Sequence, residues 1–131
     1  MARSHSTSAA RSPRRHAFTV DVEDWHDGIP LGSDRKAEAE PRLERGLDPL
    51  LEALERHGVR GTFFVLGPLA REYPAVIRRI AAAEHELGCH GWSHDLLYTM
   101  TPERLREETI RARDAIEEIV GEPVRAYRAR Y

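Results

Sequence analysis

Cysteine is nearly absent from this sequence. Cys89 is the only one, so no disulfide can form within the chain and cysteine usage leaves the redox compartment open. Cys89 could serve as a thiolate ligand or a nucleophile, or it could be a small apolar residue that ends a buried strand. We favour the last interpretation, because free cysteines are among the most buried residues in proteins.

Long apolar runs are also missing. No stretch approaches the ~18 consecutive apolar residues that read as a membrane-spanning helix, and the arginines near the N-terminus are not followed by the apolar segment of a secretory signal. We therefore expect a cytoplasmic protein. The formal net charge is only -2, so no field of the whole protein favours nucleic acid or an anionic membrane as a partner.

What is present fits one globular domain. The chain has 131 residues, a length sufficient for a domain with its own core. Of these residues 40% are hydrophobic and 32% charged, which is typical of a globular protein. Residues 1–15 differ, because they are rich in Ser, Ala and Arg and contain no acidic residue. We interpret them as a disordered basic tail rather than a nucleic-acid-binding arm, since they lack aromatic residues. The domain is expected over residues 16–131.

Short β-rich segments alternate with segments of helical spacing along the rest of the chain. We expect strands at residues 17–22, 61–67, 86–89 and 124–127. We expect a long loop over residues 25–41, and helices that run from Leu43 to near Gly58, open at Pro68 and at Pro74, and run from Thr101 to Gly121. This alternation predicts an α/β fold with a parallel sheet and right-handed crossovers.

Polar groups follow three of these four strands. The acidic segment 21–24 ends the first strand, His90 and His94 follow the third, and Arg128 follows the fourth. The carboxyl ends of parallel strands form one edge of a sheet, and such folds carry their chemistry there. We therefore expect these groups to meet on one rim.

The histidine pair indicates a metal site. Neutral imidazoles and carboxylates bind zinc and similar ions, and a catalytic site keeps one position open for water. Gly91 permits the backbone turn that would let His90 and His94 share one ion. The acidic segment would supply a ligand and a second carboxylate that accepts a proton. The spacing by itself fits a chance pair of surface histidines equally well.

The remaining histidines have no comparable partner in the sequence. We expect His26, His57 and His85 to be surface or helix-end residues rather than ligands. A zinc-type site needs several ligands at once, so a histidine without a partner is more simply explained as a structural residue.

With these motifs assembled, the chain resembles the polysaccharide deacetylases with NodB homology, which form carbohydrate esterase family four. It is most similar to the branch whose first motif reads Asp-Val-Glu-Asp-Trp. The matching stretches are 19–25 (TVDVEDW), 61–67 (GTFFVLG), 85–94 (HELGCHGWSH) and 123–129 (PVRAYRA). Their order and spacing match across residues 17–129, and this combination is far more specific than any one motif.

The resemblance implies a partial, distorted (β/α) barrel with about four parallel strands, and an activity that removes N-acetyl groups from amino sugars. The expected partner is a polysaccharide or an amino-sugar oligosaccharide. By position Asp21 would be the general base, and Arg128 would be the arginine that orients it. Trp25 and Trp92 could stack on sugar rings or close the core of the barrel.

The resemblance also implies a bound divalent metal ion, with zinc as the expected ion. His90 and His94 would be its histidine ligands. The carboxylate ligand would be Glu23 or Asp24, because this branch spaces its acidic residues differently from the common form with adjacent aspartates.

Two features depart from the family's pattern. Arg130 stands where the third motif has proline, and no histidine follows His94 to act as the general acid. Family members continue for about another half of a barrel of ~200 residues or more. We therefore expect a truncated domain with little or no activity alone, and an open sheet edge that favours marginal stability and self-association.

Two other functions stay open on the sequence alone. One is a non-catalytic module that binds metal or carbohydrate, or that interacts through its open edge. The other is hydrolysis of a C–N bond in a small molecule such as a ureide, which a related barrel performs.

Overall fold

The computed structural model describes residues 15–27 and 39–130. The expected basic tail, apart from Arg15, lies outside the described residues, as does most of the predicted loop over residues 25–41. The elements of the described part are β1 (Thr19–Val22), α2 (Leu43–Arg56), β2 (Thr62–Val65), α3 (Gly67–Glu72), α4 (Pro74–Ala82), β3 (Glu86–Cys89), η1 (Leu97–Thr99), α5 (Pro102–Val120) and β4 (Ala126–Tyr127). The strands and α-helices lie where the sequence predicts them, although β1, β2 and β4 are shorter than predicted and η1 was not predicted.

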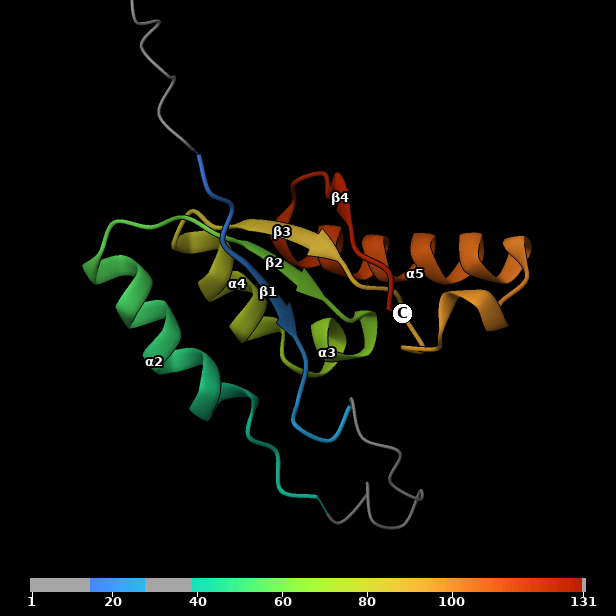
Figure 1. The fold of residues 1–131 in the computed structure, drawn as a ribbon, viewed down its shortest axis with the longest axis horizontal. Helices are drawn as coiled ribbons and strands as arrows, with labels where there is room; N and C mark the ends of the chain where they lie inside the picture. The colour runs from blue at the N-terminus through green and yellow to red at the C-terminus, as the bar shows by residue number, and fades with distance from the viewer. Residues whose placement is uncertain (1–14, 28–38, 131) are drawn as a thin grey trace, which may run out of the picture.

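The four strands form one parallel sheet in the order β1-β2-β3-β4. Figure 1 shows β1, β2 and β3 side by side at the centre of the molecule. β1 and β4 each have one strand neighbour among the described residues. The predicted α/β class with four parallel strands is confirmed.

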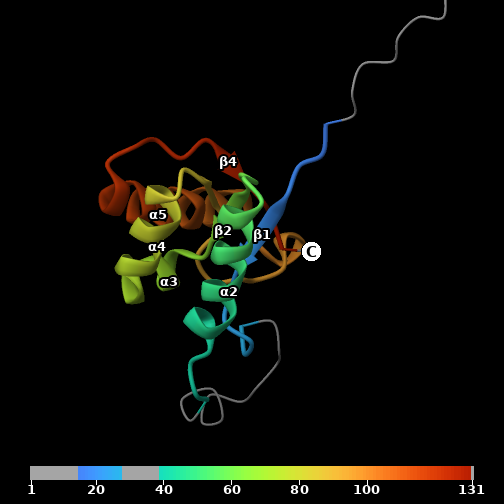
Figure 2. The same cartoon turned by 90° about the vertical axis from the view of Figure 1, so that its left-hand side faces the viewer.

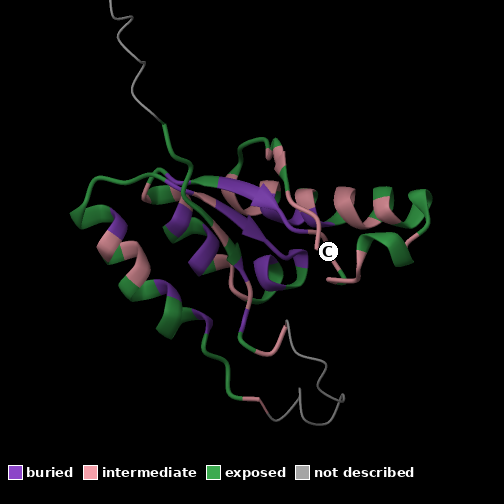
Figure 3. Cartoon of the chain, in the orientation of Figure 1, coloured by how far each residue is buried: buried purple, intermediate pink, exposed green. Residues whose placement is uncertain are grey.

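The helices lie on one face of this sheet (Figure 2). The side chains buried between helices and sheet include Phe63, Val65, Val76, Ile77, Ile80 and Ile116. Each buried side chain of this kind contributes about 1.5–3 kcal/mol, so this layer stabilises the sheet. Figure 3 shows β2 and β3 largely buried at the centre, whereas much of α2 is exposed and much of α5 is of intermediate burial. Within the described ranges, no helix is both long and apolar enough to cross a membrane.

The longest helix begins and ends where the sequence predicts. Thr101 Oγ1 accepts a hydrogen bond from the N–H of Arg104 at 3.2 Å, and Pro102 occupies the first turn. Gly121 has a φ of 73°, in the left-handed region, and this conformation ends α5. Ala112, Ala115 and Ile116 are buried, so this side of α5 packs against the rest of the domain.

The histidines without a predicted role have different environments. His57 is exposed directly after α2, as expected for a helix-end residue, and His26 is partly buried. His85 is buried, and the expectation of a surface position is wrong for this residue. Its ring packs against Phe63, with 4.9 Å between the ring centroids, and its Nδ1 accepts a hydrogen bond from the N–H of Gly61 at 3.2 Å.

Candidate metal centre

Three of the predicted side chains meet at the carboxyl ends of β1 and β3. Glu23 Oε1 lies 2.9 Å from His90 Nε2 and 3.0 Å from His94 Nε2. One ligand atom from each of the three residues lies within 4.8 Å of the other two. The two histidines therefore converge with a carboxylate, and of the two candidates Glu23 is the one that lies between them.

Backbone carbonyls orient both imidazole rings. His90 Nδ1 lies 2.8 Å from the carbonyl oxygen of Arg128, and His94 Nδ1 lies 3.1 Å from the carbonyl oxygen of Asp27. Because a carbonyl oxygen can only accept, each Nδ1 carries a proton and donates it. Nε2 is then the atom of each ring that faces Glu23: it donates to Glu23 when the ring is protonated and has a free lone pair for an ion when the ring is neutral. Partners of this kind fix the tautomer of histidines that bind metal ions.

The charges of the group support one another. The hydrogen bond from His90 lowers the pKa of Glu23 below its ordinary value, against the burial that acts to raise it. Burial acts to lower the pKa of His90, but the hydrogen bonds to Glu23 and to the Arg128 carbonyl outweigh it and the pKa is raised. Glu23 is therefore a carboxylate at neutral pH, and it gives the group the negative charge that attracts a cation.

The donor set fits a zinc-type ion. One carboxylate oxygen and two imidazole nitrogens make three protein ligands, which is the number found at catalytic zinc sites with an open position. The side chains of His90 and His94 are 3% and 9% exposed, whereas that of Glu23 is 23% exposed. The ring nitrogens thus lie inside the protein, and the group is approached from the side of Glu23.

A second predicted pair lies beside this group. Arg128 donates from Nη1 to Asp21 Oδ1 at 2.6 Å and from Nη2 to Thr19 Oγ1 at 2.7 Å. The guanidinium group thus fixes one carboxylate oxygen of Asp21. The other oxygen, Oδ2, makes no hydrogen bond within the described part of the chain. The expected contact between Asp21 and Arg128 is present, and it leaves one oxygen of Asp21 for other partners.

Arg128 rests on residues that the sequence pattern did not single out. Asp21, Phe64 and Gly88 lie in register across β1, β2 and β3. A Cβ atom on Gly88 would lie 2.5 Å from the Phe64 ring, so a glycine is needed for the ring to lie over β3. The Arg128 guanidinium carbon lies 4.2 Å from the centroid of this ring, within the range of a cation–π contact. Alternation relates side chains along one strand only. The register between β1 and β2 is what places Phe64 beside Asp21.

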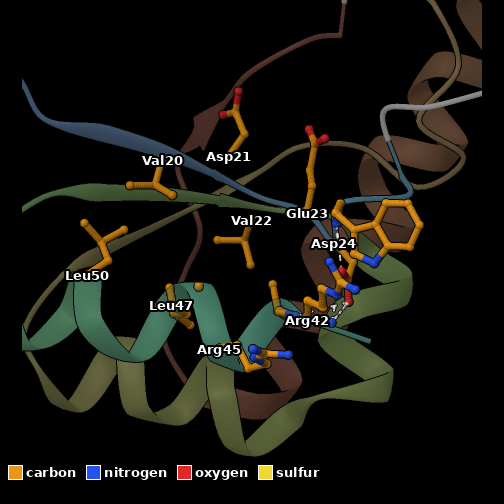
Figure 4. Close-up of a pocket in the computed structure, with 12 residues that line it drawn as sticks. Val20, Asp21, Val22, Glu23, Asp24, Arg42, Arg45, Leu47 and Leu50 are labelled. Carbon is orange, nitrogen blue, oxygen red and sulfur yellow. Dashed lines mark hydrogen bonds between the residues drawn. The ribbon is translucent and has the colours of Figure 1, made fainter. Parts of the chain in front are cut away.

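Asp24, the other candidate carboxylate ligand, lies elsewhere. It is 3% exposed, and its Oδ2 accepts hydrogen bonds from the N–H of Arg42 at 2.8 Å and of Leu43 at 3.2 Å. These N–H groups begin α2, whose own N-cap residue supplies no side-chain hydrogen bond. Figure 4 shows Asp24 bonded to Arg42 while Asp21 and Glu23 project from the other side of β1. Asp24 therefore caps a helix, and its oxygens do not join the histidines.

The two tryptophans have different surroundings. Trp92 packs so closely on Gly67 that a Cβ there would lie 2.4 Å from the indole, and the guanidinium carbon of Arg111 lies 3.6 Å from its ring centroid. Trp25 is 43% exposed, and its indole N–H donates to the carbonyl oxygen of Glu40 at 3.0 Å. Trp92 fits the packing interpretation, whereas Trp25 keeps exposed ring surface on which a ligand could stack.

Cys89 ends β3 as a buried thiol. It is 2% exposed, and burial raises the pKa of the thiol above its ordinary value. Its Sγ accepts a hydrogen bond from the N–H of Gly91 at 3.4 Å. A thiol kept protonated in this way is a poor ligand and nucleophile, so the strand-end interpretation fits this residue.

Two cavities adjoin β1, and both include Asp21 and Glu23 in their lining. One of about 460 Å³ contains both predicted groups and is lined by Asp21, Glu23, His90, His94, Arg128, Ala129 and Arg130. The other, of about 680 Å³, lies between β1 and α2 (Figure 4), and its aliphatic lining includes Val20, Val22, Leu47 and Leu50. The second cavity is larger but has no histidine in its lining, so the candidate chemistry belongs to the first.

Comparison with known proteins finds relatives of this sequence. A family model described as polysaccharide deacetylase matches residues 38–131. A peptidoglycan-N-acetylglucosamine deacetylase from Bacillus cereus is 30% identical over 95 residues, which are 69% of this chain and 34% of that protein. A peptidoglycan-N-acetylmuramic acid deacetylase from Bacillus subtilis is 32% identical over 85 residues, which are 64% of this chain and 32% of that protein. The chain spans about a third of the length of these curated relatives.

Solved structures share the fold. A Mycobacterium smegmatis protein assigned as a polysaccharide deacetylase matches with a TM-score of 0.72 and 30% identity, over 92% of this chain and 46% of that chain. A pseudoenzyme of carbohydrate esterase family four from Bacillus anthracis matches in fold with a TM-score of 0.69 and 23% identity, over 86% of this chain and 34% of that chain. The prediction of a partial (β/α) barrel of the NodB-homology type is confirmed.

Proposed function

The chain belongs to the polysaccharide deacetylase family, and from this premise we propose that its site serves the metal-dependent hydrolysis of N-acetyl groups on amino sugars of a polysaccharide. The observation that carries the proposal is the meeting of Glu23, His90 and His94 beside the pair of Asp21 and Arg128. Two relatives are named as deacetylases of N-acetylglucosamine and N-acetylmuramic acid in peptidoglycan, which supports an amino-sugar polymer as the substrate class.

Glu23, His90 and His94 are the residues that would hold the ion. When bound there, zinc would supply a Lewis acid for the acetamide carbonyl and lower the pKa of a water molecule. The mixture of one carboxylate oxygen and two imidazole nitrogens favours zinc over magnesium or calcium, which prefer oxygen ligands. The carbonyls of Arg128 and Asp27 keep the two rings in the tautomer that presents Nε2.

Asp21 is the proposed general base. Arg128 fixes its Oδ1, so the proton of the attacking water is assigned to Oδ2. Arg128 in turn is held by the Phe64 ring and by Thr19 Oγ1, and this limits the positions that the Asp21 carboxylate can take. Arg128 is therefore proposed to orient the base, in agreement with its place in the family's third motif.

The test combines zinc binding with acetate release. Isothermal titration of the metal-free chain should detect one zinc ion per chain, and acetate release from N-acetylated chitooligosaccharides and from peptidoglycan is then measured with and without zinc. Asp21→Asn should lower any zinc-dependent release by about 10²–10⁴-fold, the usual contribution of a general base, without weakening zinc binding. The Asn side chain keeps the size of Asp and an oxygen that can accept from Arg128.

Two results would contradict the proposal. A chain that binds no zinc has no functional metal centre, and zinc-dependent acetate release that is unchanged by Asp21→Asn would rule out Asp21 as the base. A chain that binds zinc and a chitooligosaccharide but releases no acetate would instead be a non-catalytic binding module.

A further inference from the structure

We propose that Arg130 is a positioning residue that fixes the main chain of His94 and so sets how tightly the group of Glu23, His90 and His94 binds a metal ion. The inference rests on the proposed function, because it concerns the affinity for the ion. It assigns a role to a residue outside the ligand set, at a position where the family's third motif has a proline.

The main chain of His94 has a conformation that needs support. Its φ is 59°, in the left-handed region that residues with a Cβ atom rarely adopt. Gly91, at the other end of the same turn, has a φ of 90°, which costs a glycine nothing. A histidine held in the left-handed region persists only when its surroundings fix it there.

Arg130 supplies this support. Its Nη1 donates a hydrogen bond to the carbonyl oxygen of His94 at 2.5 Å, and within the described ranges the main chain of His94 makes no other hydrogen bond. The imidazole is held separately, by the Asp27 carbonyl at 3.1 Å. The preceding residue, Ser93, is bound to Glu108 through its N–H at 3.1 Å and its Oγ at 2.6 Å. Arg130 is thus the contact that fixes the peptide plane leaving His94.

The segment after β4 holds several groups of the site. The Arg128 carbonyl accepts from His90 Nδ1, and the Arg128 side chain holds Asp21. Arg130 extends the same arrangement to His94. A proline has no side-chain donor, so a chain with proline here lacks this contact and must hold the histidine by other means. The role of Arg130 therefore belongs to this sequence and does not follow from the family's pattern.

Zinc affinity measured by isothermal titration tests the proposal. Arg130→Leu keeps an apolar bulk and removes the donor, and we expect about a tenfold weaker zinc affinity, at the lower end of the ~10–100-fold losses seen when partners of metal ligands are removed. Arg130→Lys keeps a donor and should recover part of the loss. Arg125→Ala is the matched control, because Arg125 is an exposed arginine just before β4 and does not line the site cavity.

Cobalt spectra separate positioning from general stability. We expect the visible absorption bands of the Co²⁺-loaded chain to shift in Arg130→Leu and to be partly restored in Arg130→Lys, because these bands report ligand geometry. A variant that is less stable to heat but binds zinc and cobalt as the unaltered chain does would overturn the proposal. So would Arg130→Leu and Arg130→Lys with equal losses, since the donor would then be irrelevant.

A missing metal centre and a missing role of Arg130 give different results. If the unaltered chain binds no zinc, or if His94→Ala binds it equally well, the proposed metal centre itself is wrong and the proposal for Arg130 falls with it. If the unaltered chain binds zinc and His94→Ala does not, while Arg130→Leu binds it normally, the metal centre stands and Arg130 has no positioning role.

Discussion

β3 has a buried histidine at each end, and the two are held in opposite ways. His85 precedes the strand and is 7% exposed, and His90 follows it and is 5% exposed. Burial lowers the pKa of His85, and the charge of Arg60 lowers it further. The pKa of His90 is raised despite its burial, because Glu23 and a backbone carbonyl accept its hydrogen bonds. With burial nearly equal, the neighbours decide the direction of the shift.

The hydrogen-bond partners of the two rings also decide which histidine can bind a metal ion. The N–H of Gly61 occupies the lone pair on Nδ1 of His85, so the backbone already uses the acceptor of this ring. In His90 the backbone carbonyl accepts the Nδ1 proton, so Nε2, which faces Glu23, is the atom that can bind an ion once it has lost its proton. A histidine near the carboxyl ends of parallel strands therefore becomes a candidate ligand here, and one at the amino ends becomes part of the core.

Exchange of each histidine for alanine should give the largest contrast. His90→Ala removes one of three proposed ligands, and we expect zinc affinity to fall by more than ~100-fold, beyond what is typical for the loss of a supporting partner. His85→Ala should leave zinc affinity nearly unchanged. Isothermal titration of both variants measures the difference, and equal losses in the two would remove the functional distinction between the ends of β3.

Variants of the two neighbouring carboxylates after β1 should separate helix capping from metal binding. Asp24→Ala removes the buried acceptor at the start of α2 and should lower the free energy of unfolding by about 2 kcal/mol, as expected for a lost helix cap with charged hydrogen bonds. Its zinc affinity should stay close to that of the unaltered chain. Glu23→Ala should instead weaken zinc binding and leave the free energy of unfolding close to that of the unaltered chain. Urea unfolding of the metal-free chain and zinc titration together measure both effects, and a loss of zinc binding in Asp24→Ala would return Asp24 to the ligand set.

A pH titration of the metal-free chain should give the smallest effect, but it compares the pKa values of His85 and His90 directly. The ordinary pKa of both histidines is 6.5, and the ring resonances in NMR spectra should titrate below this value for His85 and above it for His90. His85 therefore contributes stability that is lost as the pH falls below 6.5 toward its folded pKa. His90 contributes stability that is complete below pH 6.5 and is lost as the pH rises through its folded pKa. A pKa of His90 below 6.5 would show that burial outweighs the hydrogen bond to Glu23.

The sequence alone determined the order of the elements and the end of the sheet that carries the chemistry. Alternation of β-rich and helical segments is a local pattern, and so are the cap at Thr101 and the stop at Gly121, so each is recognisable without knowing what packs against it. Parallel strands then bring their carboxyl ends together whatever the details of packing. This rule is sufficient to place His90 and His94 on the same rim as the acidic segment.

Which of two neighbouring residues takes which role depends on contacts that form only on folding. Glu23 and Asp24 both follow β1, where strand alternation ends, so their directions depend on what packs against the exit of the strand. The start of α2, 18 residues further along the chain, takes Asp24 through the N–H of Arg42 and leaves Glu23 to the histidines. His85 and Arg130 follow the same rule, because the Gly61 N–H and the His94 carbonyl that define them lie far away in sequence. Partners brought together by folding cannot be read from the spacing of residues along the chain.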